Sequence, residues 1–140
     1  MTCHVCLTPL TSPITTDVET NHRIHEHCAI ERFIGGRWAP IAIPYFTAWY
    51  ALYPEAKANA HSLSTTHRRV ASIRAPSQAA AFHLMQGEVW SPNGEARDLI
   101  SSLGLSHTSM SVGDILVDRH GYGHLVASGF DFDFIGKVTP

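Results

Sequence analysis

The clearest hydrophobic pattern lies in the C-terminal third of the chain, where apolar and polar residues alternate. Residues 111–118 form a turn that enters an apolar run, and residues 124–128 form a second apolar run after a glycine-bearing turn. Phe130, Phe132 and Phe134 then alternate with two aspartates, which predicts a strand with buried phenylalanines and solvent-facing carboxylates. We therefore expect a small antiparallel β-sheet at this end of the chain.

The middle of the chain carries helical patterns. Aromatic residues recur at helical spacing after Pro44, and an alanine-rich segment follows Pro54. Ser77 is a start signal for a third helix, and Gly104 is a stop signal at the end of a fourth. These patterns predict helices over residues 45–53, 55–63, 78–85 and 95–103. Residues 70–74 alternate as a half-exposed strand does, and residues 88–90 are expected to form a short strand.

All three cysteines lie near the N-terminus, in spacings that suit a metal ion. Cys3 and Cys6 form a C-x2-C pair, and His25 and Cys28 form an H-x2-C pair. Two short-spaced pairs of thiolate and imidazole ligands are typical of tetrahedral Zn²⁺. A site closed by four protein ligands is structural, because catalytic zinc keeps one position open. The sequence therefore predicts one structural Zn²⁺.

The choice of histidine ligand rests on spacing alone. His25 is favoured because it lies three residues before Cys28, whereas His27 is adjacent to that cysteine and would point away from it on a helix. His22 needs a longer loop to reach the metal, and it stays open as an alternative together with His27.

The N-terminal stretch as a whole predicts a zinc finger. Residues 7–21 are expected to form a hairpin or loop, and apolar positions in residues 23–34 follow a helical period that Gly35 ends. Together with the cysteine turn, this describes a treble-clef-like module. C-x2-C, eighteen intervening residues and H-x2-C resemble the first half of a LIM-type module, and the second half is missing. The resemblance implies zinc and treble-clef topology.

The expected fold class is α+β. An N-terminal treble-clef-like zinc module, residues 1–36, is joined to a body of residues 37–140 with a small helical segment and a C-terminal antiparallel β-sheet. Hydrophobic residues make up 44% of the chain and charged residues 16%, which allows a real core. Cysteines in metal spacing, together with the absence of a secretory leader or an apolar run long enough to span a membrane, predict a cytoplasmic protein without membrane contact.

A second resemblance covers part of the C-terminal region. Residues 107–117, HTSMSVGDILV, precede a hairpin and then residues 127–130, ASGF. This segment resembles the end of the YodL-like domains of plasmid and phage proteins. The resemblance implies a mobile-element origin, in a family that accompanies antirestriction functions, and it carries no catalytic residues over to this chain.

Candidate chemistry outside the zinc site is sparse. Arg68, Arg69 and Arg74 form the one compact basic cluster and are the candidate nucleic-acid contacts, although a net charge of −2 excludes a strongly basic nucleic-acid binder. A second metal site is conceivable at a C-terminal His/Asp group, Asp118, His120 and His124. The sequence contains no nucleophile elbow, phosphate-binding glycine loop or metalloprotease motif, so an enzyme is not expected.

These observations favour a small zinc-stabilised binding protein of phage or mobile-element type that engages a host protein in the host cytoplasm. A zinc-finger nucleic-acid-binding regulator is the alternative, and a small metal-dependent hydrolase is the second alternative. The sequence does not indicate an oligomeric state.

Overall fold

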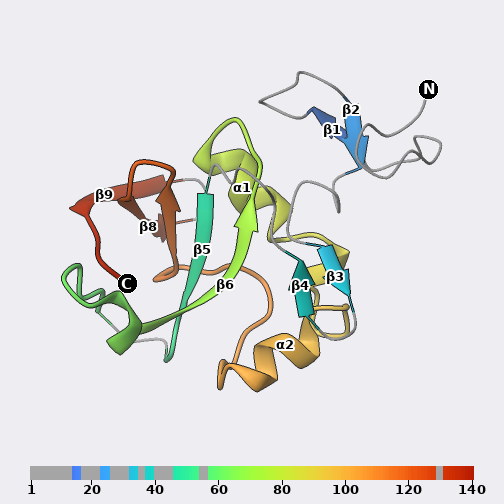
Figure 1. The fold of residues 1–140 in the computed structure, drawn as a ribbon, viewed down its shortest axis with the longest axis horizontal. Helices are drawn as coiled ribbons and strands as arrows, with labels where there is room; N and C mark the ends of the chain where they lie inside the picture. The colour runs from blue at the N-terminus through green and yellow to red at the C-terminus, as the bar shows by residue number, and fades with distance from the viewer. Residues whose placement is uncertain are drawn as a thin grey trace.

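The fold is seen in a computed structural model that describes residues 14–16, 23–25, 32–34, 37–39, 46–53, 57–128 and 131–140. Its body is a five-stranded antiparallel sheet with two short helices, an α+β arrangement (Figure 1). The strands are β5 (Phe46–Ala51), β6 (His67–Ile73), β7 (Ile115–Asp118), β8 (Tyr122–Ser128) and β9 (Asp131–Lys137), in the spatial order β6-β5-β7-β8-β9.

Strand β5 is covered by core on both faces, with β6 and β7 as its neighbours. Phe46, Ala48 and Tyr50 share one face and belong to the larger core cluster, whereas Trp49 points to the other face and belongs to a smaller one. Five of its six residues are buried. A strand with apolar residues on both faces does not alternate, and this is why the sequence pattern here resembles a helix.

Both helices pack on the same side of the sheet. Helix α1 (Gln78–Leu84) and helix α2 (Arg97–Ser102) contribute Leu84 and Ile100 to the larger cluster, which also contains the fully buried Trp90. The other face is covered by the 3₁₀ helix Leu63–Thr65 and the C-terminal residues. There the Leu63 amide donates a hydrogen bond to the Thr139 carbonyl at 2.8 Å.

The structure confirms two of the four predicted helices. Ser77 begins α1, and its hydroxyl accepts a hydrogen bond from the Ala80 amide at 3.1 Å. Gly104 follows α2 with a φ of 74°, the left-handed conformation that ends many helices. The strand predicted over residues 70–74 is confirmed as part of β6, and the hairpin of β7 and β8 is confirmed as well.

The other two predicted helices are wrong. Residues 46–51 form strand β5, and residues 57–62 are not helical; a single 3₁₀ turn begins at Leu63. The predicted strand at residues 88–90 is a 3₁₀ helix, Glu88–Trp90. The Trp90 amide closes this turn with a hydrogen bond to the Gly87 carbonyl at 3.0 Å, and its side chain is fully buried in the larger cluster.

Four short strands precede the sheet. Strand β1 (Ile14–Thr16) pairs with β2 (Arg23–His25), and β3 (Arg32–Ile34) pairs with β4 (Arg37–Ala39), both antiparallel. Of the hairpin or loop predicted over residues 7–21, the structure describes Ile14–Thr16, which form β1, and the partner strand β2 lies beyond the predicted range. The helix predicted over residues 23–34 is wrong at Arg23–His25 and at Arg32–Ile34, which are strands. Within the described ranges, no helix is long and apolar enough to cross a membrane.

Candidate functional site

An aromatic surface lies on the outer hairpin of the sheet, formed by Tyr122, His124 and Phe134. The Phe134 ring lies 5.6 Å from the Tyr122 ring and 5.7 Å from the His124 ring, measured between centroids. Phe134 is 65% exposed and Tyr122 41% exposed. The Nζ of Lys137 lies 5.5 Å from the centre of the Tyr122 ring, so a cation borders the surface. We call Tyr122, His124 and Phe134, with Lys137 at their border, the aromatic surface.

The register of β8 and β9 explains why this surface is open. Val126 pairs with Phe132, and His124 pairs with Phe134 one step further along the same face. Helix α1 covers the first pair, with the Phe82 and Phe132 rings 6.2 Å apart. In the second pair the His124 side chain is only 12% exposed, but Phe134 corrects one prediction: it is not buried, because the aromatic row extends past the helix. Phe130 lies outside the described residues.

The turn between β7 and β8 holds the base of this surface. One carboxylate oxygen of Asp118 accepts hydrogen bonds from the amides of His120 and Tyr122, at 2.9 and 3.0 Å. Gly121 adopts a φ of 85° in this turn, which an L side chain rarely adopts. On the return strand, a Cβ on Gly123 would lie 2.7 Å from Ile135, so the two strands approach closely at this point.

Asp118 also fixes the ring of His124. Its second oxygen lies 2.9 Å from Nε2 of His124, while Nδ1 of that ring lies 3.2 Å from the Gln78 side-chain amide at the start of α1. Partial burial raises the pKa of the Asp118 carboxyl, but the hydrogen bonds from His124 and from the turn amides outweigh it, so the net pKa lies below its usual value.

These contacts bear on the conceivable second metal site. The structure brings Asp118 and His124 together, but both nitrogens of the His124 ring are already in hydrogen bonds, and His120 is exposed in the turn. In the part of the chain that the structure describes, no three His, Cys, Asp or Glu residues gather as a metal-binding group.

The candidate nucleic-acid contacts lie on and beside the edge strand β6. Arg68 is opposite Tyr50 and Arg69 is opposite Trp49, and these two residues of β5 face different sides of the sheet. Because cross-strand neighbours share a face, the two arginines point to opposite sides. Arg68 donates to the His67 carbonyl, and Arg69 to the Ser72 hydroxyl. Arg74 follows the strand end. The three do not form one basic face.

The predicted zinc ligands fall largely outside the described residues. Cys3, Cys6 and Cys28 lie there, as do the alternatives His22 and His27, while His25 is the last residue of β2. The zinc site therefore stays a prediction.

A buried polar cluster was not predicted by the sequence. Asp114 has no exposed surface and accepts hydrogen bonds from the amides of Ala51 and Ser111, both at 2.8 Å. Nε2 of His107 lies 2.7 Å from its Oδ2, and the His107 ring stacks on Tyr50 with centroids 4.8 Å apart. The sequence places Asp114 in the turn before a strand, and nothing in it indicates that the carboxylate bonds β5, 63 residues away.

Burial also changes the chemistry of Tyr50. Its hydroxyl donates a hydrogen bond to the Thr108 carbonyl at 2.8 Å. Burial and, to a lesser extent, the nearby Asp114 carboxylate raise the pKa of Tyr50 well above its usual value of 10, so the phenol stays protonated. Tyr50 thus anchors the segment that carries His107.

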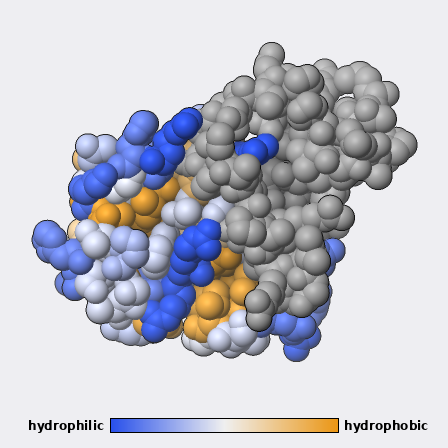
Figure 2. All heavy atoms as spheres, viewed as in Figure 1, coloured by the Kyte–Doolittle hydropathy of each residue, from blue (hydrophilic) through white to orange (hydrophobic). Residues whose placement is uncertain are grey.

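Figure 2 shows hydrophobic patches among hydrophilic side chains on one face of the molecule. Comparison of the chain with protein-family models, with curated proteins and with solved structures finds no significant match. The resemblances to LIM-type modules and to YodL-like domains therefore stay predictions, and the site must be interpreted from its own geometry.

Proposed function

We propose that the chain is a small zinc-stabilised binding protein of phage or mobile-element type that engages a host protein through the aromatic surface. In this proposal, Cys3, Cys6, His25 and Cys28 hold one structural Zn²⁺ in a treble-clef-like module of residues 1–36. The body of residues 37–140 presents the binding surface in the host cytoplasm, and the protein inhibits a host defence or redirects a host process.

The observation that carries the proposal is the exposed Tyr122–Phe134 pair. Phe134 is 65% exposed, although a buried phenylalanine side chain contributes roughly 1.5–3 kcal/mol of hydrophobic free energy. Large aromatic side chains are enriched at the centres of protein interfaces, where they bury much area with few rotatable bonds. A partner that covers both rings recovers this free energy.

The backbone next to the rings supports the same proposal. Strand β9 is an edge of the five-stranded sheet, and no other described strand pairs with its outer side. An extended segment of a partner can pair with such an edge, with backbone hydrogen bonds for affinity and side-chain pockets for specificity. Asp131, Asp133 and Lys137 are exposed along this strand, so the charges of a partner segment would select its register.

The test is affinity capture from a nuclease-treated bacterial lysate with the full chain as bait. We expect one host protein to be retained saturably, and Phe134→Ser to weaken its retention at least about tenfold, as loss of an interface hot spot does. The matched control is Val112→Ser, because Val112 is 61% exposed but lies before β7, away from the aromatic surface.

Equal retention of the partner by the Phe134→Ser and Val112→Ser variants would exclude the aromatic surface as the binding site. Retention of nucleic acid from an untreated lysate, with affinity that falls steeply between 50 and 200 mM salt, would instead favour the nucleic-acid-binding alternative.

A further inference from the structure

A groove separates helix α2 from the segment that leads into β7. It has a volume of about 440 Å³, within the range of small-molecule sites. Its lining combines an arginine and a histidine with hydroxyl-bearing and apolar side chains. They are Arg97 and His107; Ser101, Ser106, Thr108, Ser109 and Ser111; and Pro92, Ile100 and Leu105. No Asp or Glu lines it, so Arg97 is the permanently charged side chain of this lining.

His107, in the loop before β7, differs from His67 and His124 of the sheet because one of its ring nitrogens makes no hydrogen bond to a described residue. Both nitrogens of His67 are hydrogen-bonded, to Thr66 and Gly113, and both nitrogens of His124 are hydrogen-bonded as well. Nε2 of His107 lies against Asp114, whereas its Nδ1 makes no hydrogen bond with any residue that the structure describes. His67 and His124 are thus satisfied structural residues, and His107 is available to a ligand.

The surroundings of His107 hold its ring in one orientation. Tyr50 stacks on one face with an interplanar angle of 12°, and the buried carboxylate of Asp114 lies at its Nε2 edge. The Asp114 carboxylate accepts a hydrogen bond from Nε2–H, which fixes the ring and leaves Nδ1 as its remaining polar atom for a ligand. Such preorganisation lowers the ordering cost of binding an anion.

Arg97 supplies a permanent cation at the groove. It lies on the same face of α2 as Ile100 and Ser101, which also line the groove, because residues three and four apart are neighbours on a helix. Arg97 has no ion-pair partner among the described residues, so its guanidinium is free to pair with a ligand. Arginine binds phosphoryl oxygens in a two-pronged geometry that lysine lacks.

We propose that this groove binds a small phosphomonoester, with the phosphoryl group between Arg97 and His107. Ser106 and Thr108 also line the groove, and in this proposal their hydroxyls provide further donors. Pro92, Ile100 and Leu105 give the groove an apolar part, which would cover the organic group of the ester.

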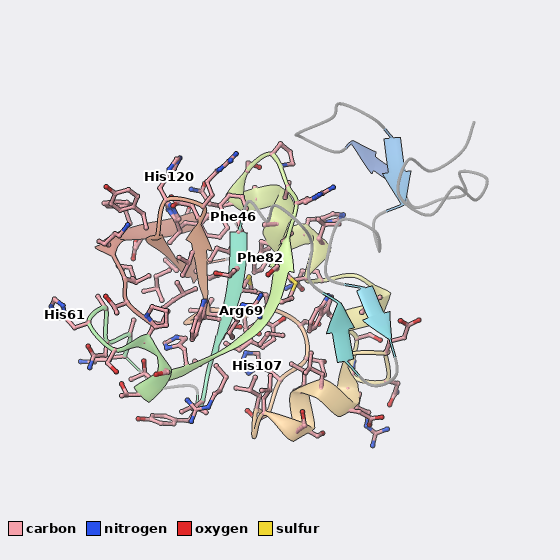
Figure 3. The ribbon with its side chains drawn as sticks, in the orientation of Figure 1. Phe46, His61, Arg69, Phe82, His107 and His120 are labelled. Carbon is pink, nitrogen blue, oxygen red and sulfur yellow. The ribbon has the colours of Figure 1, made fainter. Side chains whose placement is uncertain are left out.

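The groove and the aromatic surface lie at opposite ends of the sheet: Asp114 bonds Ala51 at one end of β5, and Asp118 is opposite Phe46 at the other. Figure 3 labels His107 near α2 and His120 at the other end.

The experiment is a titration of the isotopically labelled full chain with phenyl phosphate, inorganic phosphate and benzoate, followed by amide chemical shifts. We expect saturable shifts at residues 105–111 and α2, and tighter binding of phenyl phosphate than of the two other probes. Arg97→Gln should raise the Kd of phenyl phosphate about tenfold, the loss of one charge-assisted contact. His107→Gln should raise it similarly.

The matched controls are Arg119→Gln and His120→Gln, two exposed residues of the β7–β8 turn, which should change the Kd less than twofold. An Arg97→Gln variant with the Kd of the parent chain would overturn the proposal, as would shifts located outside the groove. Benzoate or inorganic phosphate binding as tightly as phenyl phosphate would overturn the assignment of a phosphomonoester. Arg97 is exposed, so its variant decides the question even if His107→Gln does not fold.

Discussion

His67 shows how a single buried residue links this fold to pH. It is fully buried, its Nε2 lies 2.8 Å from the Gly113 carbonyl and its Nδ1 lies 2.9 Å from the Thr66 hydroxyl. A neutral ring that donates from Nε2 and accepts at Nδ1 satisfies both contacts. Burial lowers the pKa of His67, and this effect outweighs the hydrogen bond to Gly113 and the attraction of Asp114, which both raise it.

The lowered pKa predicts a pH-dependent free energy of unfolding. Because the unfolded chain binds the His67 proton more readily than the folded chain, stability falls as the pH drops below about 6.5, the usual histidine pKa. The loss stops once the pH is below the folded-state pKa. For one proton, the slope is at most about 1.4 kcal/mol per pH unit. Urea unfolding of the parent chain and of His67→Gln between pH 7.5 and 5 measures this slope.

In that experiment, His67→Gln should have a smaller slope than the parent chain, whatever its stability at pH 7.5. His61→Gln is the control, since His61 is exposed, and it should keep the parent slope. Identical slopes for the parent chain and His67→Gln would contradict this account of His67. Because the parent chain and both variants keep the same proposed metal ligands, the difference between their slopes isolates the buried ring.

At the scale of single residues, the sequence predicts little of the polar interior. His107 and Asp114 are seven positions apart in a loop, and their contact depends on Ala51, which β5 brings to the same place. No local sequence pattern indicates a contact between residues of these two segments. The exposure of Phe134 was missed for a related reason: alternation assigns a residue to a face, but only the length of α1 decides which part of that face is covered.

At the scale of elements, the sequence predicts an element correctly where a local signal, such as a helix cap or a turn glycine, sets its boundary. The cap at Ser77, the left-handed Gly104 and the turn at Gly121 mark elements that the structure confirms. Strand β5 was missed because Trp49 and Tyr50 are buried on opposite faces, so the run shows no period of two. Core clusters on the two faces bury these residues, and pairing of β5 with β6 and β7, which come later in the chain, overrides the local propensity.

The β8–β9 pairing is tested by Gly123→Ala. The added Cβ would lie 2.7 Å from Ile135 and 2.9 Å from Val138, closer than side chains can pack. We expect the free energy of unfolding to fall by about 1–3 kcal/mol, the usual cost of overpacking. Gly87→Ala is the matched control, because its Cβ would approach the nearest atom only to 3.4 Å, and it should change stability by less than about 0.5 kcal/mol. Equal melting temperatures of the two variants would contradict the close strand approach.

At the scale of the whole molecule, the proposed zinc module makes a prediction about folding. Cys3→Ser or Cys28→Ser should release the Zn²⁺ and lower the melting temperature on the order of 10 °C, because a structural metal contributes folding free energy. Metal analysis of the purified chain should give one zinc ion, and His4→Ala should keep it. Comparing His25→Ala with His22→Ala and His27→Ala identifies the histidine ligand. Cysteine variants that keep both one zinc ion and the parent stability would contradict the ligand assignment.

The α+β class of the whole molecule follows from the sequence, because helical segments precede a run of turn-linked strands. The sequence could not predict that β5 and β6 would join the C-terminal strands in one sheet, since that pairing depends on residues more than sixty positions apart. The five-stranded sheet thus separates the aromatic surface from the groove beside His107, and the two can act independently.

The central claim, that the aromatic surface binds a host protein, is tested most directly by mapping the captured partner onto the chain. Amide chemical shifts of the isotopically labelled chain are recorded with and without the purified partner. We expect the largest changes in β8 and β9, around Tyr122 and Phe134, with loss of these changes in Phe134→Ser. Changes concentrated on β6 around Arg68 and Arg69, with β8 and β9 unaffected, would contradict the claim.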